Sequence, residues 1–364
     1  MSQKKRKQAR TSPKASGSPR PGTSQGARQA PRSGSASASR VGSAGRGSGR
    51  LQPDYPYQPM FTMPASEPMP GVDYALVMRS PAPGGAMRAI TGLALVAAGY
   101  LLITQILLYL GAWLSWLARG QHGSMQDGYA AVAGYQVPEG IVIVNLALAA
   151  AIIVVLVIAR WCNGRQPGWL VSVRPGMRWG FLACAVVVGL VVLNGIYLLA
   201  PARAALHWNP PSNAWLLMVL VVVTSPLQAA GEEFLFRGYL QQALGALTGR
   251  SWVALIVSAL VFAAMHGSQN LPLFIDRFGF GLIAGGMVLA TGGLEASIAA
   301  HAANNVSSFG YAIAGGTLAQ TRQISASNWA TTGSNVVGYL VTGVAMVAVA
   351  RLLRLRRVTP DTPS

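Results

Sequence analysis

The sequence predicts an all-α protein, a polytopic membrane helix bundle of about eight transmembrane helices behind a disordered basic N-terminal tail. The chain of 364 residues is 52% hydrophobic and only 10% charged, whereas a soluble domain carries roughly 25% charged residues. The lengths of its apolar segments are close to the length of about 20 residues that a helix needs to cross a bilayer. Its first part, by contrast, is polar and strongly basic.

The predicted tail covers residues 1–83. Residues 1–50 are rich in Ser, Gly and Arg and hold twelve Lys or Arg and no acidic residue, a composition that cannot bury enough apolar surface to fold. Residues 51–83 are rich in Pro and Met, and we expect them to be extended or disordered. Each basic residue near an anionic membrane surface adds about 1 kcal/mol of attraction. Anionic lipid headgroups are therefore the expected partner, and nucleic acid is not, since no groove-reading motif accompanies the charge.

The predicted transmembrane domain covers residues 84–351, and a short basic tail, 352–364, follows it. Eight apolar segments lie within this domain, the fifth and sixth of which are short for a span of roughly 17–25 residues. The segments are Ala89–Ala118, Ile141–Ala159, Gly180–Ala200, Ala214–Leu247, Trp252–Met265, Phe278–Thr291, Leu294–Ala314 and Asn335–Ala350.

The arginines predict an orientation, because loops on the cytoplasmic side of a membrane are enriched in Lys and Arg. Alternate loops differ sharply in this respect. One set holds Arg160, Arg165, Arg174, Arg178, Arg250, Arg351, Arg354, Arg356 and Arg357, and the other holds Arg119, Arg203, Arg277 and Arg322. We therefore predict a multi-pass plasma-membrane protein with both termini in the cytoplasm.

The segment Gly231–Arg237 places two adjacent glutamates and an arginine inside an apolar stretch. Ionisable groups at membrane depth cost at least about 2.5–3.5 kcal/mol each, so they need a partner or a function. On a helix Glu233 and Arg237 are separated by four residues and reach one another. Glu232 lies roughly 100° away and lacks such a partner. The pattern predicts that Glu233 and Arg237 support a site in which Glu232 performs the chemistry; a purely structural ion network is the alternative.

Two later apolar segments also carry polar groups. His266 ends the sequence FAAMH, and His301 and Asn305 lie in HAANN, four residues apart and hence on one helix face. Polar residues inside a membrane normally face the interior of the bundle or a water-filled cavity. Together with Glu232 these side chains would supply a carboxylate, two imidazoles and an amide, which suffice for hydrolysis by an activated water.

The three motifs EExxxR (Glu232, Glu233, Arg237), FxxxH (Phe262, His266) and HxxxN (His301, Asn305) occur in this order on successive apolar segments. In this respect the chain resembles the CPBP family of intramembrane proteases, which includes type II CAAX prenyl endopeptidases and abortive-infection relatives. The resemblance covers roughly Ala214–Ala314. It implies a glutamate-dependent endopeptidase.

The resemblance also implies the roles of the residues. Glu232 would be the general base on a water, helped by His266, while His301 and Asn305 would stabilise the oxyanion. Members of the family have also been described as metalloproteases, and in that case Glu232, His266 and His301 would hold a divalent metal, with zinc the expected ion. We favour the metal-free mechanism, because no HExxH motif is present.

Two other functions remain open: a non-catalytic membrane scaffold or immunity protein, and a transporter of ions or small solutes that uses the buried Glu, His and Asn. The sequence has no evident inverted repeat, which argues against a transporter. The expected substrate is a peptide or a membrane-proximal protein segment that arrives from the cytoplasmic side. The Ala-, Gly- and Arg-rich composition suggests a bacterial protein, for which a prenylated substrate is not expected.

Overall fold

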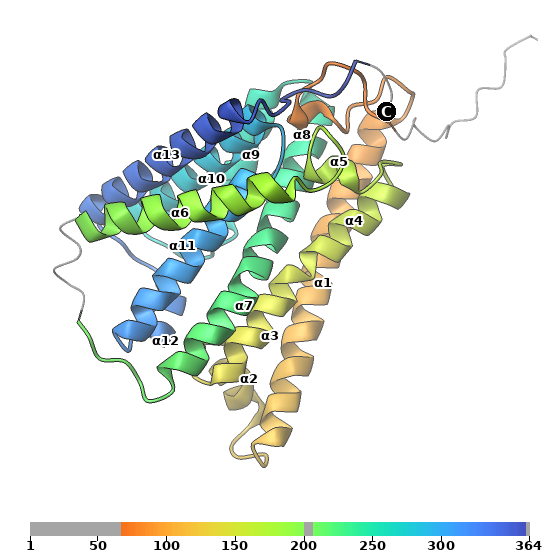
Figure 1. The fold of residues 1–364 in the computed structure, drawn as a ribbon. Coiled ribbons are helices and arrows are strands. Elements are labelled where there is room, and N and C mark those ends of the chain that lie inside the picture. Colours follow the sequence, from red (N-terminus) through yellow and green to blue (C-terminus); the bar gives the residue numbers. More distant parts are fainter. Residues whose placement is uncertain (1–66, 200–206, 362–364) are drawn as a thin grey trace, which may run out of the picture. The chain divides into compact units, whose positions relative to one another are not determined.

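The computed structural model describes residues 67–199 and 207–361. Most of the predicted tail, residues 1–66, lies outside this part of the chain. The described residues form helices, and their strand-like pairing is limited to two isolated bridges, Asp73 with Val358 and Ser172 with Gly293. The predicted all-α fold is therefore confirmed (Figure 1).

Each of the eight predicted segments is helical. The long helices are α1 (Gly85–Ala118), α3 (Pro138–Ala149) with α4 (Ala151–Trp161), α6 (Trp179–Leu199), α7 (Ala214–Glu233) with η3 (Phe234–Leu240) and α8 (Gln241–Thr248), α9 (Ser251–Ala264), α10 (Leu271–Thr291), α11 (Glu295–Ala314) and α13 (Trp329–Leu352). Four short elements were not predicted: η1 (Tyr74–Leu76), α2 (Met125–Ala133), α5 (Gly168–Val171) and α12 (Leu318–Arg322).

Not all of the eight predicted segments have the length and hydropathy of a membrane span. Within the described residues, 6 helical segments are long and apolar enough to cross a membrane. Helix α9 has only 14 residues. Helix α11 has 20 residues but is too polar, and it packs most extensively against α7 and α6. Helix α11 is largely buried between its neighbours, so it does not need the hydropathy of a lipid-facing span, whereas α9 is apolar and exposes Trp252 and Leu260.

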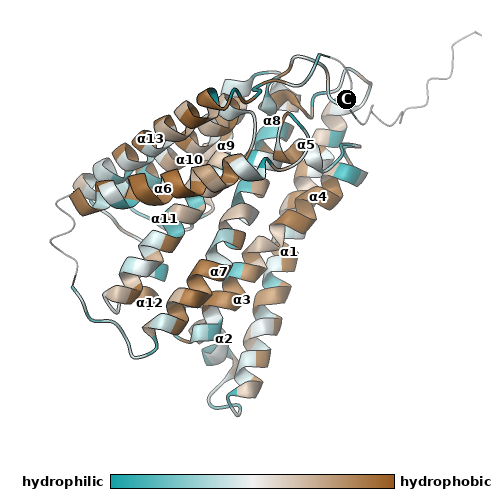
Figure 2. Ribbon diagram, viewed as in Figure 1, coloured by the Kyte–Doolittle hydropathy of each residue, from teal (hydrophilic) through white to brown (hydrophobic). Residues whose placement is uncertain are grey.

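The surfaces of the long helices fit a membrane environment. Large apolar side chains point outward; for example Leu102, Ile153, Val191 and Val344 are 63% to 66% exposed. A soluble monomer rarely exposes so much continuous apolar surface. Figure 2 shows the same contrast along the ribbon, with hydrophobic residues on the outer helices and hydrophilic residues interrupting α7 and α11. The protein is thus a multi-pass membrane protein.

One end of the bundle, which we call the arginine-rich face, gathers the α4–α6 loop, the α8–α9 turn and the C-terminal segment. The backbone amide of Val173 donates to Gly292 O at 2.9 Å, and that of Thr359 donates to Val72 O at 2.9 Å. The opposite end, the distal face, gathers other loops: Asn270 N donates to Ser325 O at 3.0 Å. The helix ends therefore alternate between two faces as the arginine pattern predicts.

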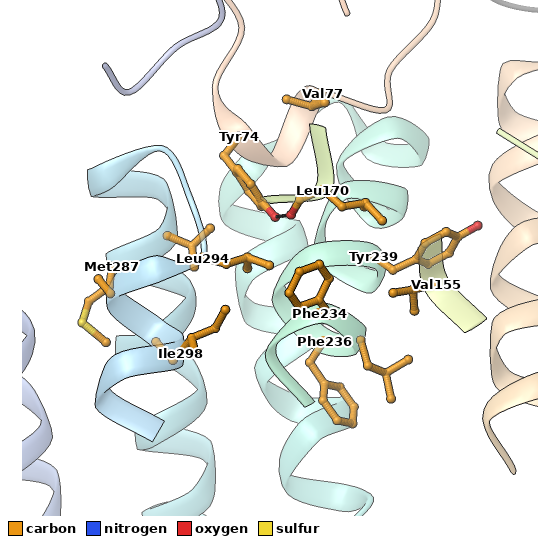
Figure 3. Packing of buried hydrophobic residues seen from close by; sticks show 14 of the residues in the cluster. Tyr74, Val77, Val155, Leu170, Phe234, Phe236, Tyr239, Met287, Leu294 and Ile298 are labelled. Atoms are coloured by element: carbon orange, nitrogen blue, oxygen red, sulfur yellow. Dashed lines mark hydrogen bonds between the residues drawn. The ribbon is translucent and has the colours of Figure 1, made fainter. Parts of the chain in front are cut away.

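Residues 67–83, predicted to be part of the disordered tail, are folded onto the arginine-rich face. Tyr74 and Val77 are fully buried, and the Tyr74 hydroxyl donates to the carbonyl of Leu170 (Figure 3). Asp73 caps η1 and accepts a hydrogen bond from Ser251 Oγ at 2.5 Å. The prediction failed because a few apolar side chains anchor a segment whose overall composition is typical of disorder.

We expect Gly245→Ala to destabilise this packing. A Cβ at Gly245 in α8 would lie 1.9 Å from Ala75 O, so the 67–83 segment would have to move, at a cost of about 1–3 kcal/mol. The matched control is Gly286→Ala in α10, where no described atom lies within 4 Å of the added Cβ. Thermal unfolding in detergent measures both variants, and equal midpoints would contradict the close packing.

Candidate active site

Helix α7 delivers the two glutamates to the interior of the bundle. Glu232 and Glu233 end the α-helix, and the next turn, η3, is a π-helix. π-helical turns widen the backbone spiral and are frequent at functional sites. The two adjacent carboxylates consequently enter different surroundings: the Glu233 side chain is 0% exposed and the Glu232 side chain is 14% exposed.

The predicted ion pair is present in the structure. Arg237 Nη1 donates to Glu233 Oε1 at 2.9 Å, and both side chains are buried. The guanidinium carbon of Arg237 lies 4.2 Å from the ring centroid of Phe262 and 5.5 Å from that of Phe280. A cation over an aromatic face is stabilised by the ring quadrupole. Arg237 therefore joins η3 to α9 and α10.

His301 connects the two glutamates. Its Nδ1 lies 2.8 Å from Glu233 Oε1, and since a carboxylate accepts, Nδ1 carries the proton. A carboxylate that accepts a hydrogen bond from one ring nitrogen of a histidine fixes the orientation of the ring and its tautomer. Nε2 of His301 then faces Glu232, 3.6 Å from its Oε2. The edge of the imidazole also meets the Phe280 ring, with centroids 5.0 Å apart.

The side-chain hydrogen bond that Glu232 accepts comes from a neutral amide and not from an arginine. Gln228 Nε2 donates to Glu232 Oε1 at 2.6 Å, and Gln228 Oε1 accepts from Asn305 Nδ2 at 2.8 Å. Through Gln228, the side chain of Asn305 on α11 is thus linked to the carboxylate of Glu232. Sequence reasoning missed Gln228, although its position four residues before Glu232 on one helix could have revealed it.

His266 lies just after α9 and is exposed. Its Nδ1 donates to the carbonyl of Phe262 at 2.8 Å, which leaves Nε2 of the neutral ring as an acceptor. His266 lines the same cavity as Glu232, His301 and Asn305. The structure therefore brings all four predicted catalytic residues to one place.

The cavity has a volume of about 650 Å³. Glu233 and Arg237 are absent from its described lining and lie behind it. Three exposed residues of its lining lie near the distal face: Ser268 after α9, Arg322 at the end of α12, and Ser325 after α12. The expectation that substrate arrives from the cytoplasmic side stays a prediction.

The residues predicted as metal ligands do not fit a metal ion in this arrangement. Within residues 67–199 and 207–361 there is no group of three His, Cys, Asp or Glu side chains that could hold one. Glu232, His266 and His301 share the cavity without forming such a set. The cofactor prediction, either none or a divalent metal, stays a prediction.

The fold and the site together define a polytopic helical membrane protein with a carboxylate–histidine cavity in its interior. The family model for type II CAAX prenyl endopeptidase Rce1-like proteins matches residues 211–307, which include both glutamates, both histidines and Asn305. Over this segment the chain is similar to that family of membrane proteases, and the match supports the resemblance to the CPBP family that the three motifs predict.

A curated relative from Bacillus subtilis (strain 168), described as "Uncharacterized protein YyaK", is 28% identical over 134 residues. The alignment covers 35% of this chain and 44% of the relative, so this chain matches less than half of that protein. No solved structure matches significantly.

We expect Arg237→Ala to damage folding far more than Glu232→Gln. Removing Arg237 leaves the buried carboxylate of Glu233 with His301 as its charge partner among the described residues, and breaking a buried pair costs about 3–5 kcal/mol. Glu232→Gln preserves shape and can still bond Gln228. Yield and unfolding midpoint in detergent provide the measurement; equal values for the two variants would count against a supporting role for the ion pair.

Proposed function

We propose that the protein is an intramembrane endopeptidase in which Glu232 activates a water that hydrolyses a peptide bond. The observation that carries this proposal is the gap of 3.6 Å between Glu232 Oε2 and His301 Nε2 at the cavity. The gap is too long for a good hydrogen bond, yet both atoms lie within reach of one bridging water. The neighbouring carboxylate, Glu233, is held by Arg237 and His301.

In the proposed reaction Glu232 removes a proton from the water while the water oxygen bonds to the peptide carbonyl carbon. Gln228, itself held by Asn305, donates to Glu232 Oε1 and keeps this carboxylate in place. When the tetrahedral intermediate collapses, the C–N bond breaks and Glu232 returns the proton to the leaving amine. His266 bonds Phe262 through Nδ1, and its other ring nitrogen, Nε2, would assist these proton transfers.

The carbonyl oxygen becomes an oxyanion during this reaction and needs donors. We assign that role to His301 and Asn305. Asn305 Nδ2 carries two hydrogens and uses one of them to donate to Gln228, so the second is available. His301 serves as a donor when its Nε2 is protonated. An oxyanion donor is typically worth about 2.7–4 kcal/mol of transition-state stabilisation.

Glu232→Gln should lower peptide hydrolysis by about 100- to 10,000-fold with little change in the unfolding midpoint, because the amide cannot accept the proton. Glu139→Gln is the matched control: it makes the same change at a glutamate that pairs with Arg119 at 2.7 Å outside the cavity lining. Purified proteins and a fluorogenic peptide give the rates. Normal cleavage by well-folded Glu232→Gln protein would exclude this mechanism, and a scaffold or transporter would hydrolyse no peptide in either form.

A second test addresses the metal. Because Glu232, His266 and His301 do not form a metal-holding group, we expect purified active protein to contain no stoichiometric zinc and to keep its activity in a strong chelator. Elemental analysis measures the metal content of the wild type and of His266→Ala and His301→Ala. One zinc per chain in the wild type, lost in both variants, would reverse the conclusion.

A further inference from the structure

The two faces of the bundle differ strongly in charge. Within the described residues, eleven arginines lie at the arginine-rich face and three at or near the distal face. The first set is Arg79, Arg88, Arg160, Arg165, Arg174, Arg178, Arg250, Arg351, Arg354, Arg356 and Arg357; the second is Arg119, Arg277 and Arg322. Cytoplasmic ends of membrane helices carry the excess of Lys and Arg. This asymmetry assigns the arginine-rich face to the cytoplasm and the distal face to the outside.

The arginine-rich face is closed above the site. The segment 67–83 covers it, and backbone contact is so close that a Cβ at Gly245 would meet Ala75 O. Gln242 Nε2 donates to Trp169 O at 2.9 Å. Below this cover lies a layer of buried apolar side chains, in which Figure 3 shows Tyr74, Leu170, Phe234 and Leu294. A peptide arriving from this face would have to displace the whole layer.

A buried ion pair reinforces this closure. Arg178 Nη2 lies 2.5 Å from Glu295 Oε2, and the glutamate side chain is 0% exposed. Arg178 Nη1 also donates to Thr291 O at 2.9 Å. These bonds tie the start of α6 to the start of α11, directly under the 292–293 turn.

The distal face, in contrast, is open. His266 is exposed, and so are Arg322, Ile324 and Ser325, all of which line the cavity. No described lining residue comes from the loops of the arginine-rich face. A second cavity of about 490 Å³ shares Asn304 with the first and continues to His207, again toward the distal face.

Together these observations indicate the side of the membrane from which substrate reaches the cavity. We propose that the active site takes polypeptide from the extracytoplasmic side: an extended peptide outside the cell, or the extracytoplasmic flank of another membrane protein. This inference rests on the proposed function, since it specifies the substrate of the same site.

Two single-cysteine variants test the accessible side in a background that lacks Cys162 and Cys184. Ser325→Cys places a thiol at the cavity mouth, and Thr248→Cys places a matched thiol at an exposed position of the arginine-rich face. A membrane-impermeant maleimide added to right-side-out vesicles should label only Ser325→Cys, and inside-out vesicles should show the reverse. Labelling of Ser325→Cys only in inside-out vesicles would overturn the proposal.

Cleavage supplies the second measurement. A pool of fluorescence-quenched, membrane-impermeant random peptides is added to wild-type vesicles. We expect the fluorescence to rise through hydrolysis in the right-side-out preparation and not to rise in sealed inside-out vesicles. A bulky maleimide on Ser325→Cys should reduce cleavage relative to the same variant unlabelled. Hydrolysis confined to inside-out vesicles would refute extracytoplasmic access. Absence of hydrolysis in both preparations and in detergent would refute the proposed protease function instead, while the labelling result would still decide which side the cavity faces.

Discussion

The carboxylate of Glu233 is the contact on which the rest of the site depends. A single oxygen, Oε1, accepts from Arg237 at 2.9 Å and from His301 at 2.8 Å. Arg237 in turn lies against Phe262 and Phe280, so four helical elements, α7–η3, α9, α10 and α11, meet at one buried group. Such a charge is tolerable in a membrane interior only while its partners stay in place. The network therefore holds the geometry of the cavity that lies in front of it.

The two adjacent glutamates show how surroundings divide labour between identical side chains. Glu233 is fully buried and held by cationic and imidazole donors, whereas Glu232 faces the cavity and is bonded by the neutral amide of Gln228. Pairs of carboxylates with unlike environments are a recurrent basis for acid–base chemistry. Here the side chains of Asn305 and Gln228 orient the Glu232 carboxylate without neutralising its charge, as the proposed general base requires.

A second buried pair, Arg178 with Glu295, has a different effect. It anchors the beginning of α11 beneath the arginine-rich face, and the segment 67–83 seals the same region through Tyr74 and Val77. Helix α11 can be polar because it is enclosed by α6, α7 and α13. The segment 67–83 therefore covers one end of the bundle, and His301 lines the cavity farther along α11.

The sequence by itself determined the local features: the helices, because apolar runs of spanning length fold that way in a bilayer, and the Glu233–Arg237 pair, because four residues make one helical turn. The three motifs also identified the family. Only the tertiary structure decided that Gln228 binds Glu232, that residues 67–83 fold onto the bundle, and which residues line the cavity. These depend on how helices pack across long sequence separations, and no local spacing or composition records that packing.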